Sequence, residues 1–251
     1  MSAVRPMNTT ILTFDTLDST NTEAIRQARE GAAEGLCIIA RQQTAGRGRL
    51  GRTWISEKDA GLYFSIVLRP RIDARYLPLI TLMTGVAVHD TLVEFGLRPD
   101  IKWVNDIHVN GKKISGILSE TAETPDGLAV IVGIGINLRP SNFSPEIADI
   151  ATSLEQIVGK VSIEALTGSM IKYLAYFYDV LQDTDGNFAI IDEWRRRSSY
   201  FMGKHVRVSV GEEMLTGVTD GLEWNGALRI KCDDGSITIV QAGDVENLRA
   251  S

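Results

Sequence analysis

Apolar and polar residues alternate with two different periods along residues 10–197. Nearly continuous apolar runs, which favour buried strands, cover residues 36–40, 62–68 and 128–136. Shorter strands are expected at residues 11–14, 100–103, 107–109 and 112–118. The turn dipeptide Asn110-Gly111 predicts that two neighbouring strands form a hairpin. Helical spacing predicts helices over residues 77–95 and from residue 163 to about residue 197.

A further helix is expected between the first two strands. Residues 20–23 read Thr-Asn-Thr-Glu, which fits a capping box at the start of a helix. Ala24, Ile25 and Ala28 then form an apolar stripe, and Gly31 can end the helix.

The pattern of apolar and polar residues changes near residues 198–204. Beyond them come four short alternating runs, at residues 205–210, 214–219, 227–232 and 236–240, with turn residues between them at 211–212, 225–226 and 233–235. This spacing is typical of a small β-barrel. We therefore predict an α+β domain at residues 1–198, with a mixed sheet flanked by helices, and a β-barrel domain at residues 199–251.

Composition narrows the class of protein. The 251 residues carry a formal charge of −6, which argues against a protein built mainly to hold nucleic acid. Cys37 and Cys232 lack metal-ligand spacing, so free thiols in a reducing compartment are expected, and three scattered histidines do not suggest zinc. The N-terminus has no long apolar run. We expect a cytoplasmic protein that does not contact a membrane.

Residues 44–54 carry the most unusual composition in the chain. Three arginines and three glycines follow the expected strand at 36–40, so this segment should be a loop. Glycine allows close approach of the backbone to a ligand, and the arginine fork suits phosphate and carboxylate oxygens. A mobile cationic flap over an anion and a basic RNA-binding segment both fit this loop taken alone.

Four other segments contain residue types that suggest binding or catalysis. They are residues 19–21 at a helix start, 102–106 with a lysine between apolar neighbours, 113–120 with a glycine inside a strand, and 133–137 with two glycines on one strand face. A buried lysine is costly unless an anion meets it, and strand glycines often mark a close ligand approach. Helix capping and an exposed edge lysine are the purely structural alternatives.

Together these segments resemble the biotin protein ligase family. Residues 46–54 are similar to its glycine–arginine signature loop, and residues 113–120 and 133–137 to its two following strand motifs. Residues 102–106 are similar to its Lys-Trp-Pro-Asn-Asp motif, with Val104 in place of proline. The resemblance implies the fold shared with class II aminoacyl-tRNA synthetases, followed by an SH3-like barrel.

The resemblance also implies a two-step reaction. Biotin and ATP, with Mg²⁺, form biotinyl-5′-AMP, and the biotinyl group then passes to a lysine of a biotin carboxyl carrier protein. The implied catalytic residues are Lys102, Arg47 and Arg49. The implied biotin contacts are Ser19, Thr20, Asn21, Gln43, Arg47, Gly48, Arg49, Lys102 and Gly116. The implied nucleotide contacts are Arg47, Arg49, Trp54, Asn105, Lys113 and Asn137, although Trp54 fits the core equally well. No protein metal ligand is implied.

Partners and alternatives follow from the same comparison. Some family members carry an N-terminal DNA-binding domain, but only about a dozen residues precede the first expected strand, too few for a helix-turn-helix unit, so we expect no DNA binding. Family members often pair sheets side by side, so a homodimer is plausible. A lipoate ligase or octanoyltransferase shares the fold but lacks this loop pattern, and a non-catalytic RNA- or carrier-binding module is the alternative from another class.

Overall fold

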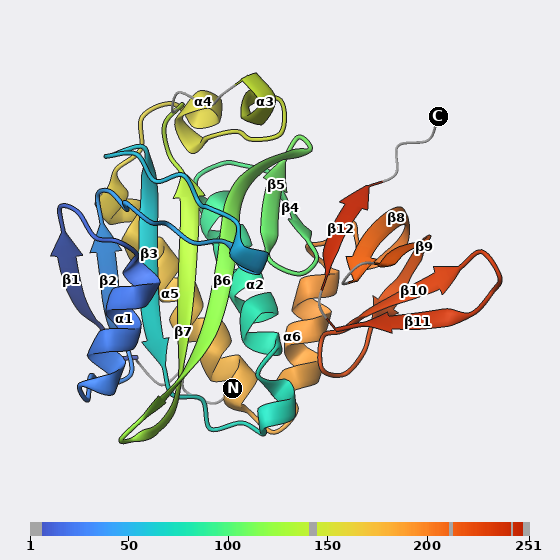
Figure 1. The fold of residues 1–251 in the computed structure, drawn as a ribbon, viewed down its shortest axis with the longest axis horizontal. Helices are drawn as coiled ribbons and strands as arrows, with labels where there is room; N and C mark the ends of the chain where they lie inside the picture. Colours follow the sequence, from blue (N-terminus) through green and yellow to red (C-terminus); the bar gives the residue numbers. More distant parts are fainter. Residues whose placement is uncertain (1–6, 141–144, 211–212, 242, 248–251) are drawn as a thin grey trace.

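The computed structural model describes residues 7–140, 145–210, 213–241 and 243–247. A seven-stranded sheet forms the larger part of the molecule (Figure 1). Its strands are β1 (Thr10–Phe14), β2 (Leu36–Ala40), β3 (Gly61–Leu68), β4 (Pro99–Lys102), β5 (Asp106–Val109), β6 (Lys112–Thr124) and β7 (Gly127–Asn137). Their order across the sheet is β1-β2-β3-β7-β6-β5-β4. β1 and β2 are parallel and all other neighbours antiparallel, so the sheet is mixed, as predicted.

Helices cover both faces of this sheet. Helix α1 (Thr20–Arg29) lies on one face, and α2 (Leu79–Glu94), α5 (Ile163–Gln182) and α6 (Gly186–Arg195) lie on the other (Figure 1). Successive residues of a strand face opposite sides. Ile38 and Val67 therefore pack with α1, while Cys37 and Ile66 belong to the large core on the α2 side. Burial of both faces explains why the central strands read as continuous apolar runs.

The helical pattern over residues 163–197 is divided into two helices. α5 ends at Gln182, α6 begins at Gly186, and Asp183 and Asp185 lie at the break. A Cβ atom at Gly186 would lie 2.3 Å from the carbonyl oxygen of Leu181, so only glycine fits this tight connection. Short helices α3 (Pro145–Ala148) and α4 (Leu154–Val158) precede α5, and 3₁₀ turns occur at Arg49–Gly51 and Ala74–Tyr76.

The C-terminal part is a five-stranded antiparallel sheet. It contains β8 (Met202–Val210), β9 (Glu213–Leu222), β10 (Leu228–Cys232), β11 (Ile237–Val240) and β12 (Asp244–Asn247), in the order β11-β10-β9-β8-β12. The sequence pattern missed β12, because its residues Asp-Val-Glu-Asn are mostly polar and only pairing with β8 makes them a strand. The turn expected at residues 211–212 lies outside the described residues.

The two parts share one continuous apolar core. Val206 and Leu228 of the C-terminal sheet belong to the same buried cluster as Leu82 of α2. Buried Trp103, which directly follows β4, donates its indole N–H to the carbonyl oxygen of Gly226 at 3.0 Å. The tryptophan of the 102–106 segment therefore joins the two parts. The peptide bond between Trp103 and Val104 is cis.

None of the helices in the described part of the chain is both long and apolar enough to cross a membrane.

Candidate functional site

One cavity opens on the sheet face that carries α1, beneath the segment that follows β2. The start of α1, the arginine-rich loop, β3, β5, β6 and β7 all contribute to its walls. Of the residues expected at the site, it brings together Ser19, Thr20, Asn21, Gln43, Arg47, Gly48, Arg49, Trp54, Asn105, Lys113 and Gly116. These residues come from four separate segments of the sequence, at residues 19–21, 43–54, 105 and 113–116, so the fold assembles them.

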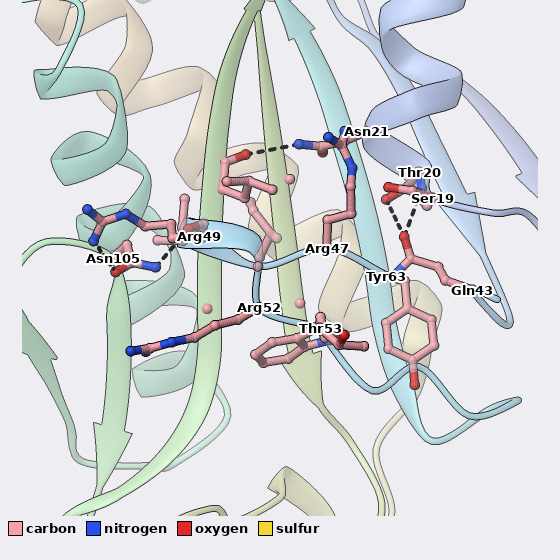
Figure 2. Close-up of a pocket in the computed structure, with 18 of the residues that line it drawn as sticks. Ser19, Thr20, Asn21, Gln43, Arg47, Arg49, Arg52, Thr53, Tyr63 and Asn105 are labelled. Atoms are coloured by element: carbon pink, nitrogen blue, oxygen red, sulfur yellow. Dashed lines mark hydrogen bonds between the residues drawn. The ribbon is translucent and has the colours of Figure 1, made fainter. Parts of the chain in front are cut away.

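A hydrogen-bonded group of hydroxyls and amides forms one end of the cavity. The backbone N–H of Thr20 donates to Gln43 Oε1 at 2.8 Å, and the Thr20 hydroxyl lies 3.2 Å from the same atom (Figure 2). Gln43 Nε2 donates to the Ser56 hydroxyl at 2.8 Å. Ser65 Oγ lies 2.8 Å from Thr20 Oγ1 and 2.6 Å from Asn21 Oδ1. This end offers both donors and acceptors in a buried setting.

The capping box predicted at Thr20 was wrong. Ser19 is the N-cap residue of α1 and makes no side-chain cap bond, while Thr20 is already helical. The Thr20 side chain bonds Gln43 instead, and Glu23 pairs with Arg26 at 2.6 Å. The polar side chains that could have capped the helix locally thus bond residues of β3 and of the segment after β2 instead.

The arginine-rich loop folds back on itself over the cavity. The Trp54 N–H donates to the carbonyl oxygen of Gly46 at 2.9 Å, and the Gly48 N–H to that of Arg52 at 2.7 Å. A Cβ atom at Gly46 would lie 2.4 Å from the Trp54 carbonyl oxygen, so this closure requires glycine. Glycine at position 46 therefore has a structural cause.

Arg47 and Arg49 leave the loop in different directions (Figure 2). Arg47 extends toward Asn21 and makes a two-pronged ion pair with Glu120, with nitrogen–oxygen distances of 2.9 and 2.8 Å. Arg49 extends the other way and donates to Asn105 Oδ1 at 3.1 Å and to the carbonyl oxygen of Gly243 at 3.3 Å. The loop is thus connected to the sheet at one end and to the C-terminal part at the other.

Three glycines form a flat floor beneath the loop. Gly116 lies opposite Gly135 in the β6–β7 ladder, and Gly133 lies opposite Leu118. A Cβ atom at Gly135 would lie 2.4 Å from the Trp54 ring, and one at Gly133 would lie 2.2 Å from Asn21 Oδ1. The protein's own Trp54 and Asn21 therefore use the space that these glycines leave.

Trp54 is a wall of the cavity. The sequence left its place open between the core and the nucleotide; the structure puts its indole over the floor, with Lys113 Nζ 5.4 Å from the ring centre. Its buried indole N–H has no hydrogen-bond partner among the described residues. A buried donor without a partner is uncommon and can serve a ligand.

Charged residues gather where β4, β5 and β6 meet the cavity. Lys113 Nζ lies 2.7 Å from Asp106 Oδ1, and Lys102 lies opposite Asp106 in the register of the β4–β5 ladder. His108 follows Asp106 on the same strand face. Burial, reinforced by the Lys102 charge, lowers the pKa of His108 to about 4. The imidazole is therefore neutral at pH 7.

Two expected site residues are not among those that line the cavity. Lys102 is half-buried at the end of β4, next to the lining residue Asp106. Asn137 ends β7, and its side-chain amide donates to the carbonyl oxygen of Thr152 at 3.1 Å, which connects β7 to the segment before α4. Both lie on elements that border the site.

Sequence reasoning missed several residues of the site. Arg52, Tyr63 and Asp106 line the cavity, while Ser65 and Glu120 hold residues that line it. Ser65 is a fully buried serine inside the mostly apolar strand β3, and Glu120 lies four positions after Gly116, on the same strand face. An unexplained polar residue on a buried strand was the available signal.

Residues 13–137 match the family described as "Biotin/lipoate A/B protein ligase family", and residues 201–246 match the "Biotin protein ligase C terminal domain". The bifunctional ligase/repressor BirA of Bacillus subtilis is 36% identical over 94% of this chain and 73% of its own length. This chain belongs to the biotin/lipoate A/B protein ligase family.

Two further members cover almost the full length of both chains. The biotin–[acetyl-CoA-carboxylase] ligase of Paracoccus denitrificans is 32% identical over 90% of this chain and 95% of its own. The Aquifex aeolicus biotin protein ligase, solved in complex with biotin and ATP, superimposes with a TM-score of 0.82 at 29% identity, covering 96% of this chain and 99% of its own. The resemblance seen in the sequence motifs thus extends through the C-terminal part.

Proposed function

We propose that this chain is an ATP-dependent biotin protein ligase. It joins the biotin carboxylate to AMP and then transfers the biotinyl group to a lysine of a biotin carboxyl carrier protein. The observation that carries the proposal is the cavity itself: a buried donor-and-acceptor end lies beside a glycine floor, under a loop with three arginines. Family membership and the likeness to a ligase solved with biotin and ATP support it.

The donor-and-acceptor end suits the ureido ring of biotin. That ring has two N–H donors and one carbonyl acceptor, and Ser19, Thr20, Asn21 and Gln43 offer hydroxyl and amide groups from buried or half-buried positions. We assign the valeryl chain to the part of the cavity next to Gly48 and Gly116, beside the Trp54 and Lys113 side chains that lie over Gly116. The dithiolane ring of a lipoyl group has no N–H or carbonyl group and would leave such polar groups unmatched.

In the first step the biotin carboxylate attacks the α-phosphorus of ATP and pyrophosphate leaves. Both reactants are anions, so cations are needed where negative charge accumulates. Lys102 and the loop arginines Arg47 and Arg49 are assigned this role. Asn105, Lys113 and Trp54 border the nucleotide, and Asn137 holds the strand end beside it. Mg²⁺ enters with the triphosphate as part of the substrate.

In the second step the neutral ε-amine of the acceptor lysine attacks the acyl carbon. A C–N bond forms, the bond between that carbon and the bridging oxygen breaks, and AMP and a proton leave. The loop over the cavity keeps water away from the mixed anhydride until the acceptor arrives. We place the reaction in the cytoplasm, and we propose a homodimer formed by sheets that lie side by side.

Two substitutions test the assignment of the cations. Lys102→Ala and Arg49→Ala are expected to keep the fold but lower the rate of biotin-dependent pyrophosphate release by roughly 10²–10³-fold. The control is Arg75→Ala, an exposed arginine in the Ala74–Tyr76 turn. Labelled biotin, ATP and a carrier domain report the whole reaction, and a panel of acyl substrates separates biotin from lipoate. Normal pyrophosphate release by either variant contradicts the assignment.

A further inference from the structure

Glu120 holds two residues that reach the cavity from other elements. Its carboxylate accepts both prongs of the Arg47 guanidinium, at 2.9 and 2.8 Å, and its Oε2 atom also accepts from Asn21 Nδ2 at 2.7 Å. Arg47 belongs to the loop, Asn21 to α1 and Glu120 to β6. One carboxylate therefore joins the lid, the helix and the floor of the site.

The hydrogen bonds fix Asn21 from both sides. Its Oδ1 atom lies 2.6 Å from the Ser65 hydroxyl, and its Nδ2 atom also lies 3.2 Å from the carbonyl oxygen of Leu118. Gly133 leaves the space in which the amide sits. Because Asn21 is buried, loss of the Glu120 carboxylate would leave one of its donors with a poorer partner.

The ion pair also holds Arg47 at one end of the cavity. The Arg47 and Glu120 side chains are 42% and 25% exposed, so water screens the pair only in part. The parallel fork geometry is the strong form of such a contact. Arg47 is held at the hydroxyl-and-amide end, whereas Arg49 lies at the opposite end with Asn105 (Figure 2).

We propose that Glu120 is a positioning residue for biotin: it fixes Arg47 and Asn21 at the ureido end and so closes the loop over the bound vitamin. This inference rests on the proposed function. It also places the two arginines: Arg47 is held at the ureido end by this carboxylate, whereas Arg49 lies at the opposite end with Asn105.

The test measures the binding of biotin and the use of ATP separately. Glu120→Ala is expected to raise the Kd for biotin, measured by calorimetry, about tenfold. Glu120→Gln, whose amide oxygen still accepts from Asn21 but carries no charge, is expected to raise it about threefold. The KM for ATP, measured at saturating biotin, stays within about twofold of the parent. Glu123→Gln makes the same change at an exposed position of β6 and leaves all values unchanged.

A double-mutant cycle shows whether Glu120 acts through Arg47. In an Arg47→Ala background, Glu120→Ala should cost no more than about threefold in biotin affinity, the part that acts through Asn21. Full additivity, or equal effects on biotin and ATP, overturns the inference. A parent protein that binds no biotin overturns the proposed function instead, so the two failures are distinguishable. Thermal melting of each variant verifies that it is folded.

Discussion

The contact between Trp54 and Gly135 gives the sharpest prediction, for the substitution Gly135→Ala. Gly135 lies two residues before the end of β7, a central strand that alanine can occupy without backbone strain. The added methyl group would lie 2.4 Å from the nearest ring carbon of Trp54 and 2.6 Å from the indole nitrogen. Ordinary contacts between such atoms are about 3.6 Å, so the ring must retreat by roughly 1 Å.

The cost follows from the overlap and from the exposure of the ring. Overpacking of this kind costs about 1–3 kcal/mol when the contact must be kept. In the empty protein the half-buried indole can move toward the solvent, so we expect the free energy of unfolding to fall by only about 1 kcal/mol. A ligand that binds only when the indole lies over the floor loses the full 1–3 kcal/mol of binding free energy, which corresponds to a loss of roughly 5- to 150-fold in affinity.

Calorimetric titration with biotin and with ATP measures this loss, and thermal melting measures the change in stability. The matched control is Gly168→Ala in α5, where a Cβ atom would have no neighbour within 4 Å. That change should leave binding unaltered and raise helix stability by about 0.5–1 kcal/mol.

A second background separates the ring clash from a general effect on the strand. If the methyl group acts by displacing the indole, Gly135→Ala should cost far less affinity in a Trp54→Ala protein than in the parent. An equal loss in both backgrounds, or unchanged affinity in the single variant, would refute this reasoning.

Three other measurements test the structure in different ways. The pKa of His108 is lowered from 6.5 to about 4 on folding, so protonation favours the unfolded chain, and stability should fall as the pH drops from about 6.5 to 4. His108→Gln should remove up to about 3 kcal/mol of that fall in urea unfolding at pH 7 and 4.5; identical pH dependence would contradict it. Burial raises the pKa of Cys37 to about 12, so iodoacetamide should alkylate only the half-exposed Cys232 in the native protein, as peptide mapping reports. Trypsin should cut within residues 44–53 faster without ligand than with biotin and ATP, and equal cutting rates would count against a closing loop.

Local patterns in the sequence determined the elements and the chemical character of the site. Strands such as β3 and β7 are almost entirely apolar because both faces of the sheet are covered, so their positions were readable directly. The loop at residues 44–54 was readable for a similar reason, since its glycines and arginines fit neither a strand nor a helix. The order and spacing of the motifs were enough to indicate the family.

Only the tertiary structure decided which polar groups are partners. Asn21 and Glu120 are 99 positions apart and Arg47 and Glu120 are 73 apart, so the strand register and the path of the loop bring them together. The same cause explains why the capping box did not form, because the Thr20 hydroxyl bonds Gln43, which lies 23 positions later in the sequence. Hydrophobic periodicity is a local property of the chain, whereas a hydrogen bond or an ion pair between distant residues depends on how the tertiary structure places their segments.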